Sequence, residues 1–302
     1  MSVLPVFEQS LQTAGIKQIN STELYPALHA AGDAGLPMLV VDNDLGRAVI
    51  ALQGAHVMSF KPAGHREMLW VSPKCVLEAG KPIRAGIPLC VPWFGPSDDG
   101  TVMHGFGRTM VWTPVAAEAC ADGSTRAVLE LASDAAVSAL WRHAFSFRLE
   151  FVVGTSLKLT LTAENRSATP APFAFAFHTY FSVPNVKDAL VTGLEDITFI
   201  DKTEPMTRKV QRGGVAITAL TDRVYLDVSA TQVLKTATGN VSILSDSKCA
   251  VVWNAWTNDI NMADLGEGNH VGYLCVERGD VADYAITLPP GGEYQTVMTL
   301  SY

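Results

Sequence analysis

"SFRLEFVVGTSLKLTLTAEN", residues 146–165, is the stretch that most directly indicates how this chain folds. Two runs of alternating apolar and polar residues flank the short segment 154–156, which begins with a glycine. Alternation with a period of two is typical of strands that bury one face, and short Gly-containing connections are typical of hairpins. We therefore expect two antiparallel strands joined at residues 154–156.

Similar short runs, rich in alternating or β-branched residues and bounded by turn residues, recur along the whole chain. They include residues 38–43, 47–60, 126–133, 196–201, 241–246, 249–256, 272–277 and 294–302. This spacing predicts an all-β fold, a sandwich or barrel of antiparallel strands. Helical periodicity is weak, and only short helices are expected, near residues 6–14, 22–31 and 134–142.

The domain organisation follows from length and from the lack of an obvious linker. The 302 residues, 48% of them hydrophobic, suffice for one large all-β domain or two modest ones. No internal repeat or Pro/Ser-rich run divides the chain. We predict a single domain over residues 1–302, with residues 1–35 as a lead-in. The alternative is two domains divided near residues 120–135.

Charge and cysteine content bound the class of function. The net charge is −8 and the isoelectric point is near 5.3, which disfavours nucleic acid and anionic membranes as partners. The N-terminal residues contain no basic segment followed by an apolar run, and no apolar stretch approaches the ~20 residues of a membrane span. The five cysteines are widely spaced without a CxxC motif, as in reduced cytosolic proteins. We expect a soluble, cytoplasmic, unmodified protein.

The segment "PFAFAFHTYF", residues 172–181, is unusual as a strand. Three phenylalanines, at positions 173, 175 and 177, would point to one face, and the other face would carry small alanines followed by His178 and Tyr180. One interpretation is tight packing with a buried core histidine. The other is that the alanines leave room for a ligand on which His178 acts.

A second segment is too rich in Gly and Pro to form a regular strand or helix. It comprises "GKPIRAGIPLCVPWFGP", residues 80–96, and is followed by "MHGFGRTMVW", residues 103–112. Long loops of distinctive composition often carry function, which makes the flanking Arg84 and Arg108 candidate binding residues. One alternative is a loop that covers one end of the sheet and leaves both arginines in solvent. Another is that one arginine braces the loop by bonding to its carbonyls, as is expected of Arg84 because it lies inside the loop. "HGFGR" lacks the spacing of a dinucleotide-binding motif.

The segment "GYLCVERGD", residues 272–280, ends a predicted strand with a carboxylate. Tyr273, Cys275 and Glu277 would share one face, and burial there would raise the pKa of Glu277 toward neutrality, as suits a general base. The alternative is an edge glutamate paired with Arg278.

"VVWNAWTND", residues 251–259, places Trp253 and Trp256 on either side of Asn254, with Asp259 three residues further on. Aromatic rings beside amides and carboxylates are typical of sugar-binding clefts, but also of sheet edges. The sequence shows no metal-ligand spacing, nucleophile elbow or phosphate-binding loop. We therefore expect acid–base chemistry without a metal or nucleotide.

Taken together, these segments resemble the aldose 1-epimerase-like superfamily. "LQGAHVMSF", "LWVS", "GKPIRAGIPLCVPWFGP", "HGFGR", "FHTYF", "VVWN", "MADLG" and "CVE" occur in the family's order, over roughly residues 36–300. The arginine-containing pair of segments is most similar to the glucose-6-phosphate 1-epimerase (hexose-6-phosphate mutarotase) branch. The resemblance implies a large antiparallel β-sandwich of the galactose mutarotase type.

Motif by motif, the resemblance assigns roles to particular residues. It implies a catalytic histidine at His178, a catalytic glutamate at Glu277 and substrate-binding residues at Arg84, Arg108 and Asp222. His104 of "HGFGR" and Trp253 and Asn254 of "VVWN" are further expected substrate contacts. Three positions depart from the family: Met103 replaces a frequent glutamine, Ala85 a glycine and Arg278 a proline.

The implied activity is interconversion of the α and β anomers of hexose 6-phosphates, without a cofactor. Glu277 would act as the base and His178, as an imidazolium, as the acid. The alternatives are a mutarotase for unphosphorylated aldoses and a non-catalytic sugar-phosphate-binding protein. The expected partner is a small sugar phosphate, and the chain is expected to be a monomer.

Overall fold

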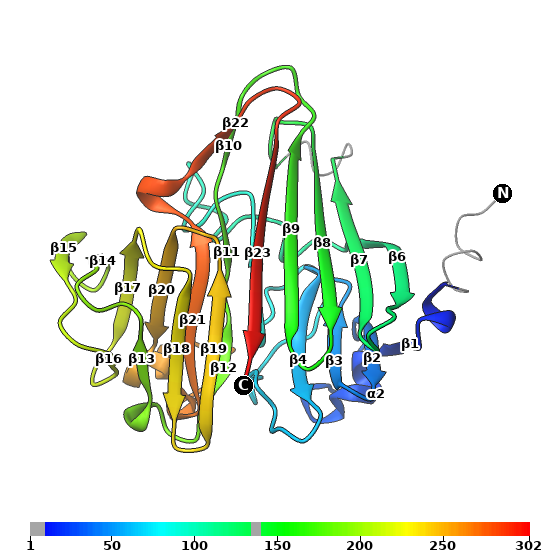
Figure 1. The fold of residues 1–302 in the computed structure, drawn as a ribbon, viewed down its shortest axis with the longest axis horizontal. Coiled ribbons are helices and arrows are strands. Elements are labelled where there is room, and N and C mark those ends of the chain that lie inside the picture. The colour runs from blue at the N-terminus through cyan, green and yellow to red at the C-terminus, as the bar shows by residue number, and fades with distance from the viewer. Residues whose placement is uncertain (1–9, 134–139) are drawn as a thin grey trace.

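The computed structural model describes residues 10–133 and 140–302, and the expected hairpin is present in it (Figure 1). Strand β8 (Phe145–Val153) pairs antiparallel with β9 (Leu157–Asn165), and residues 154–156 connect them. The hairpin forms the middle of a nine-stranded sheet with the order β16-β13-β18-β19-β23-β9-β8-β7-β6. Its other strands are β16 (Val215–Ala216), β13 (Leu190–Thr192), β18 (Thr231–Thr236), β19 (Gly239–Ser245), β23 (Glu293–Ser301), β7 (Thr125–Ala132) and β6 (Thr113–Ala119).

A second, eight-stranded sheet lies behind the left part of the first in Figure 1. It comprises β15 (Thr207–Val210), β14 (Thr198–Asp201), β17 (Thr221–Leu226), β20 (Cys249–Asn254), β21 (Tyr273–Asp280), β11 (Phe175–Phe177) and β5 (Leu89–Cys90), and β12 (Tyr180–Ser182) also pairs with β21. A four-stranded sheet lies behind the right part: β1 (Ile16–Asn20), β2 (Pro37–Asn43), β3 (Gly46–Ala51) and β4 (His56–Pro62). Finally, β10 (Ala171–Phe173) pairs with β22 (Ile286–Leu288).

Neither the N-terminal segment nor the region around residue 125 behaves as a separate unit. Strand β1 pairs with β2, so part of the expected lead-in is an edge strand of the four-stranded sheet. Strand β7 pairs with both β6 and β8, so one sheet continues through the region where two domains would have divided. Strand pairing therefore continues across residues 120–135.

Helices are short, as the weak helical periodicity predicts. Among the described residues they are α2 (Ser21–Leu24) and five short 3₁₀ helices, η1 (Pro26–Leu28), η2 (Val186–Asp188), η3 (Trp256–Asn261), η4 (Asn269–Gly272) and η5 (Ala282–Tyr284). Residues 10–13 are also helical. The helix expected over residues 22–31 is thus reduced to two short pieces. The expected helices at residues 6–14 and 134–142 lie partly outside the described residues.

The main hydrophobic core lies between the nine-stranded sheet and the other two sheets. It takes side chains from all three, for example Phe151 from β8, Ile50 from β3 and Val276 from β21. Antiparallel strands bury alternate residues, and the sheets are therefore held together by their facing apolar sides. The outward face of the eight-stranded sheet carries two smaller clusters, one around Val251 and one around Tyr180.

The segment 172–181 is divided into three short strands, β10, β11 and β12. The chain leaves the strand at His178, whose backbone N–H donates to the carbonyl of Pro88 at 2.9 Å. The predicted alternation is nevertheless confirmed, because the three phenylalanines belong to the main core whereas Ala176 and Tyr180 belong to outward clusters. The face that carries the small alanines and Tyr180 therefore points outward, away from the main core.

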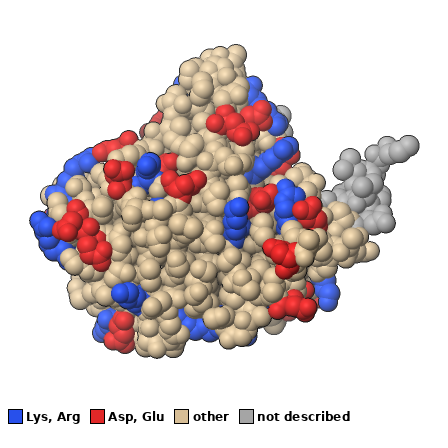
Figure 2. Space-filling view, viewed as in Figure 1, with Lys and Arg blue, Asp and Glu red and all other residues tan. Residues whose placement is uncertain are grey.

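On the face shown in Figure 2, acidic and basic side chains lie interspersed around the periphery, and no patch of a single sign covers it. Among the described residues, none of the helices combines the length and apolar character needed to cross a lipid bilayer.

Candidate functional site

The candidate site lies on the outward face of the eight-stranded sheet. In β21, Leu274 and Val276 pack into the main core, whereas Tyr273 and Cys275 belong to an outward cluster. The predicted shared face is therefore confirmed for those two residues, and Glu277 continues it, lining a cavity on this side. Strand β21 lies inside the sheet, between β20 and β11, so Glu277 is not at an edge.

A cavity of about 250 Å³ opens at this face. It brings together seven of the eight predicted site residues, and its lining comprises Arg84, Phe94, Met103, His104, Arg108, His178, Lys202, Asp222, Val251, Trp253, Met262 and Glu277. The volume suits one sugar unit, being smaller than the usual ~300–1,000 Å³ of pockets for drug-sized ligands.

Volume alone does not select this cavity, since two others are larger, at about 610 and 590 Å³. Hydrogen bonding selects it. Five buried side-chain polar atoms lack a partner among the described residues, and three of them belong to residues of the small cavity: Arg108 Nε, His178 Nδ1 and Glu277 Oε2. Neither larger cavity is lined by such a residue. Unsatisfied buried polar groups are costly, and they are therefore concentrated at functional sites.

His178 and Glu277 face each other across the floor of the cavity. The distance between His178 Nε2 and Glu277 Oε1 is 3.4 Å, and the side chains are 10% and 1% exposed. The ring of His178 stacks on Tyr180 at 5.0 Å between centroids and meets the edge of Trp253 at 6.0 Å. Packing thus fixes the imidazole, while the contact between the two titratable groups remains long.

The electrostatic surroundings move both pKa values toward the neutral forms. Burial lowers the pKa of His178 well below its usual value, helped by His104, Arg84 and Arg108. Burial raises the pKa of Glu277 well above its usual value, and the charge of Asp222 adds to this. The raised pKa of Glu277 agrees with the sequence prediction. In the free protein, burial disfavours the charged form of His178, so the imidazolium expected from the sequence needs a ligand to stabilise it.

A hydrogen bond to the ring of His104 determines which of its nitrogens carries the proton. Its Nδ1 accepts a hydrogen bond from the Gly95 backbone N–H at 3.2 Å, which leaves the ring proton on Nε2. Burial, followed by the charge of Arg108, lowers the pKa of His104 to about 3, so the ring is neutral. The ring lies 5.7 Å from that of His178 between centroids. His104 can therefore donate to a bound oxygen without carrying charge.

Arg84 is held by two partners at the cavity wall. Its Nε and Nη2 donate to the Asp264 carboxylate at 3.1 and 3.2 Å, and its Nη1 donates to the Tyr180 hydroxyl at 2.9 Å. Tyr180 also stacks on His178, so one tyrosine contacts both Arg84 and the predicted catalytic histidine. Sequence reasoning missed Asp264, although "MADLG" was among the recognised segments.

Arg108 differs from Arg84 in having no carboxylate within 4 Å among the described residues. Its Nη2 donates to the Met103 carbonyl at 2.7 Å, and its Nε has no partner. An arginine that braces the irregular loop through a carbonyl was the alternative expected for Arg84. The structure gives that contact to Arg108, which also retains donors for a ligand.

Lys202 is a cation that the sequence did not reveal. It follows β14, and its Nζ lies 3.3 Å from Asp222 Oδ2 and 5.7 Å from the centre of the Phe94 ring. No motif surrounds this lysine. Only the pairing of β14 with β17, which carries Asp222, brings it to the cavity.

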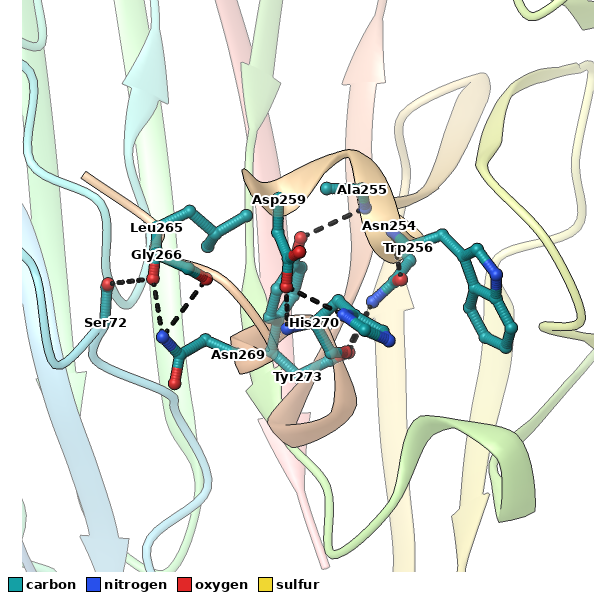
Figure 3. Close-up of polar contacts among 10 residues, drawn as sticks. All are labelled: Ser72, Asn254, Ala255, Trp256, Asp259, Leu265, Gly266, Asn269, His270 and Tyr273. Atoms are coloured by element: carbon teal, nitrogen blue, oxygen red, sulfur yellow. Dashed lines mark hydrogen bonds and ion pairs between the residues drawn. The ribbon is translucent and has the colours of Figure 1, made fainter. Parts of the chain in front are cut away.

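Asn254 lies beside the cavity but outside its lining. Its amide nitrogen donates to the carbonyls of His270 and Tyr273 at 3.0 and 2.9 Å, and its oxygen accepts from the Trp256 N–H at 2.8 Å (Figure 3). Asp259 Oδ2 accepts from the backbone N–H of His270 at 3.0 Å and contacts its Nδ1 at 2.7 Å. These bonds fix the segment 254–272, which carries Asp264. Asn254 is fully buried and its amide groups are occupied by the chain.

Arg278 does not pair with Glu277, because consecutive strand residues point to opposite faces. Its guanidinium is fully buried on the inward side and donates to the carbonyls of Ala230 and Ser247 at 3.0 and 2.6 Å and to Gln232. Burial lowers the pKa of Arg278 to about 10. The alternative interpretation of an edge glutamate paired with Arg278 is therefore wrong.

The tertiary structure also gathers a set of metal-ligand atoms that the spacing did not suggest. His178, Cys275 and Glu277 each offer one such atom, and the three atoms lie within 4.8 Å of one another. Cys275 is fully buried, with its thiol pKa raised by burial.

Comparison with known proteins agrees with this geometry. The sequence profile described as "Aldose 1-epimerase" matches residues 37–301. The chain belongs to the aldose 1-epimerase family. Proteins named "Putative glucose-6-phosphate 1-epimerase" from Salmonella typhimurium and Cenchrus ciliaris are 34% and 32% identical over 261 and 272 residues, which is 84% of this chain in both cases and 87% and 80% of theirs.

Solved structures of the family have the same architecture. The crystal structure of a "putative mutarotase (YeaD)" from Salmonella typhimurium superimposes with a TM-score of 0.83 at 30% identity, over 95% of this chain and 96% of that one. A "galactose mutarotase related enzyme" from Lactobacillus acidophilus, at 17% identity, shares the fold with a TM-score of 0.70, over 88% of this chain and 97% of that one. The predicted antiparallel fold of the galactose mutarotase type is confirmed. This aldose 1-epimerase family member is an epimerase that acts on a small sugar.

Proposed function

We propose that this epimerase interconverts the α and β anomers of hexose 6-phosphates, chiefly glucose 6-phosphate. One observation carries the proposal. Two buried acid–base atoms, His178 Nδ1 and Glu277 Oε2, have no hydrogen-bond partner in the described part of the chain, and they belong to a cavity that Arg108 also lines with no carboxylate of that part within 4 Å. The first two residues suit ring opening, and the third suits an anionic group on the sugar.

Anomer exchange needs three events and no change in redox state. A base removes the proton of the C1 hydroxyl, an acid protonates the ring oxygen, and the C1–C2 bond rotates before the ring closes again. Both oxygens are bonded to the same carbon, so the acid and the base must lie side by side. The 3.4 Å separation of His178 and Glu277 meets this requirement. Positioned acid–base groups contribute typically ~10² to 10⁴ in rate.

His178 and Glu277 together hold the same number of protons before and after ring opening. With the closed sugar bound, Glu277 is a carboxylate and His178 an imidazolium. Ring opening transfers one proton to Glu277 and takes one from His178, and reclosure reverses both transfers. The opposite pKa directions favour the neutral pair, the state that accompanies the open-chain sugar. A phosphate dianion in the cavity favours the imidazolium, because an opposite charge stabilises it.

The phosphate is proposed to contact Arg108 and Lys202, with Arg84 as a further support. At −8 the protein repels a sugar phosphate dianion, so local cations must overcome that field. Arg84 is already bonded by Asp264 and Tyr180, and Lys202 is shared with Asp222. Arg108 is thus the cation most available to a ligand, and guanidinium matches phosphate oxygens with paired donors.

The test is NMR measurement of anomer exchange on glucose 6-phosphate and on glucose. Arg108→Ala should raise KM for glucose 6-phosphate about 10- to 100-fold, because charge-assisted bonds contribute ~1.5 to 3 kcal/mol. Exchange on free glucose should be nearly unchanged. Arg212→Ala, which removes a largely exposed guanidinium paired with Asp196, is the matched control.

Equal losses on both sugars in Arg108→Ala would support the rival function, a mutarotase for unphosphorylated aldoses. Binding of either sugar without any exchange would support a non-catalytic sugar-phosphate-binding protein. A monomeric state and a cytoplasmic location remain predictions from the sequence, as does a single domain over residues 1–302.

A further inference from the structure

The buried cluster of His178, Cys275 and Glu277 includes one residue that proton transfer does not use. Anomer exchange needs His178 and Glu277, whereas Cys275 supplies neither proton. Yet its sulfur lies within 4.8 Å of the ligand atoms of both residues, and all three side chains are buried. His178 Nδ1 and Glu277 Oε2 have no hydrogen-bond partner among the described residues, so ligand lone pairs are free.

The chemistry of this donor set selects the type of cation. One imidazole nitrogen, one sulfur and one carboxylate oxygen form a mixed set that suits Zn²⁺, whereas Mg²⁺ and Ca²⁺ prefer oxygen ligands alone. Zinc sites with three protein ligands keep a fourth position for water or another molecule. Here that position would face the cavity, which both His178 and Glu277 line.

The charges around the cavity permit a cation to enter. Two of the three cationic residues are offset by carboxylates: the Arg84–Asp264 pair at 3.0 Å and the Lys202–Asp222 pair at 3.3 Å. Glu277 adds a further carboxyl group. Arg108 remains as the opposing charge without a carboxylate within 4 Å among the residues described.

We propose that His178, Cys275 and Glu277 form a binding site for Zn²⁺, and that the bound cation inhibits the enzyme reversibly. The inhibitory part rests on the proposed function. Binding would require the Cys275 thiol to lose its proton to solvent, forming a sulfur–zinc bond. With their lone pairs directed to the cation, His178 and Glu277 could not exchange protons with a sugar. Zn²⁺ and the sugar should therefore compete.

The site can be tested without any sugar by titrating the protein with Co²⁺, which substitutes for Zn²⁺ and absorbs light when bound to a thiolate. The wild-type protein should develop a thiolate-to-cobalt absorption band that Zn²⁺ abolishes. Cys275→Ser should lose the band. Cys249→Ser is the matched control, because Cys249 is also fully buried but its Sγ contacts the Val281 carbonyl outside the cluster. Glu277→Gln is a second variant, which should weaken Co²⁺ binding while retaining the thiol.

Inhibition is then measured on glucose 6-phosphate, with each variant compared to its own rate without zinc. Cys275→Ser should raise the Zn²⁺ concentration for half-inhibition about 100-fold, since even outer partners of metal ligands change affinity 10- to 100-fold. Cys249→Ser should not change it. The proposal is overturned if no thiolate band appears, if the band survives in Cys275→Ser, or if the two serine variants respond alike to Zn²⁺. Absence of exchange on every sugar, with the band present, would overturn the proposed function and the inhibition but retain the site.

Discussion

Two buried histidines in this enzyme each face a carboxylate, and the two pairs are equally buried. The side chains of His178 and His270 are 10% and 11% exposed, and those of Glu277 and Asp259 are both 1% exposed. The contacts differ. His270 Nδ1 lies 2.7 Å from Asp259, which also accepts the backbone N–H of His270, whereas His178 lies 3.4 Å from Glu277.

The pKa directions of the two carboxyl groups are opposite for this reason. Burial raises the pKa of both. In Asp259, the hydrogen bonds from His270 outweigh burial, and the net pKa is lowered. In Glu277, Oε2 has no hydrogen-bond partner among the residues that the structure describes, and burial raises the pKa. Burial alone therefore does not distinguish a reactive carboxylate from a structural one; the satisfaction of its oxygens does.

The largest expected difference between the pairs is in turnover. His178→Ala and Glu277→Gln should each lower anomer exchange by about 10² or more, because each removes one of two proton transfers. His270→Asn should change kcat by less than about tenfold, since His270 holds the segment 254–272 and transfers no proton. Exchange is measured by NMR on glucose 6-phosphate, with circular dichroism to show that each variant is folded.

Comparable kcat losses in folded His178→Ala and His270→Asn would break the comparison. The comparison would also fail if His178→Ala and Glu277→Gln both kept more than about a tenth of the wild-type rate, because each group is expected to contribute ~10².

The second expected difference is in stability, with opposite signs for the two carboxylates. Glu277→Gln should raise Tm at pH 8 by about 2 °C or more, because a buried polar group without a hydrogen-bond partner costs ~1 to 3 kcal/mol. Asp259→Asn should lower Tm by roughly 2 to 8 °C, because bonds to a charged group contribute ~1.5 to 3 kcal/mol. Calorimetry at pH 5 and pH 8 measures both changes.

The stability contributions of Glu277 and Asp259 should depend on pH in opposite directions. The contribution of Glu277, whose pKa is raised on folding, favours the folded state below its usual pKa near 4.5 and is lost as the pH rises toward the folded value. The advantage of Glu277→Gln should therefore widen from pH 5 to pH 8. Asp259, whose pKa is lowered, contributes above its usual 3.8, so the cost of Asp259→Asn should persist at both values. A destabilised Glu277→Gln would show that the carboxylate has a structural partner.

The smallest expected effect is that of metal removal. Exhaustive dialysis against a chelator should leave the exchange rate unchanged within about twofold, because His178 and Glu277 complete both proton transfers themselves. If exchange stopped after dialysis and returned with a divalent cation, His178 and Glu277 would be ligands of a metal that the reaction requires. The comparison with His270 and Asp259 would then no longer apply.

Much of the fold was determined by local sequence. Period-two alternation and a short Gly-containing connection predicted the β8–β9 hairpin, and the same pattern predicted both faces of β21. Such signals are local because neighbouring strand residues point to opposite sides whatever the rest of the chain does. Seven of the twelve residues that line the cavity had been predicted as site residues.

Other features depended on which segments the fold brings together. Asn254 and Asp259 belong to the segment 251–259, which the sequence offered as part of a sugar-binding cleft. In the structure, backbone carbonyls and N–H groups and the His270 ring occupy their polar atoms. Lys202 lies in no recognised motif, and only the pairing of β14 with β17 brings it to the cavity. Asp264 lies in "MADLG", but the motif did not show that its carboxylate binds Arg84 at the cavity wall.

By itself the sequence determined an antiparallel β fold, the outward face that bears His178 and Glu277, and the two arginines near it. Only the tertiary structure decided the direction in which burial moves the pKa of His178, the different partners of Arg84 and Arg108, and the approach of Cys275 to His178 and Glu277. The physical reason is that pKa and hydrogen bonding depend on distances of a few ångströms between segments ~100 residues apart, and no local pattern records those distances.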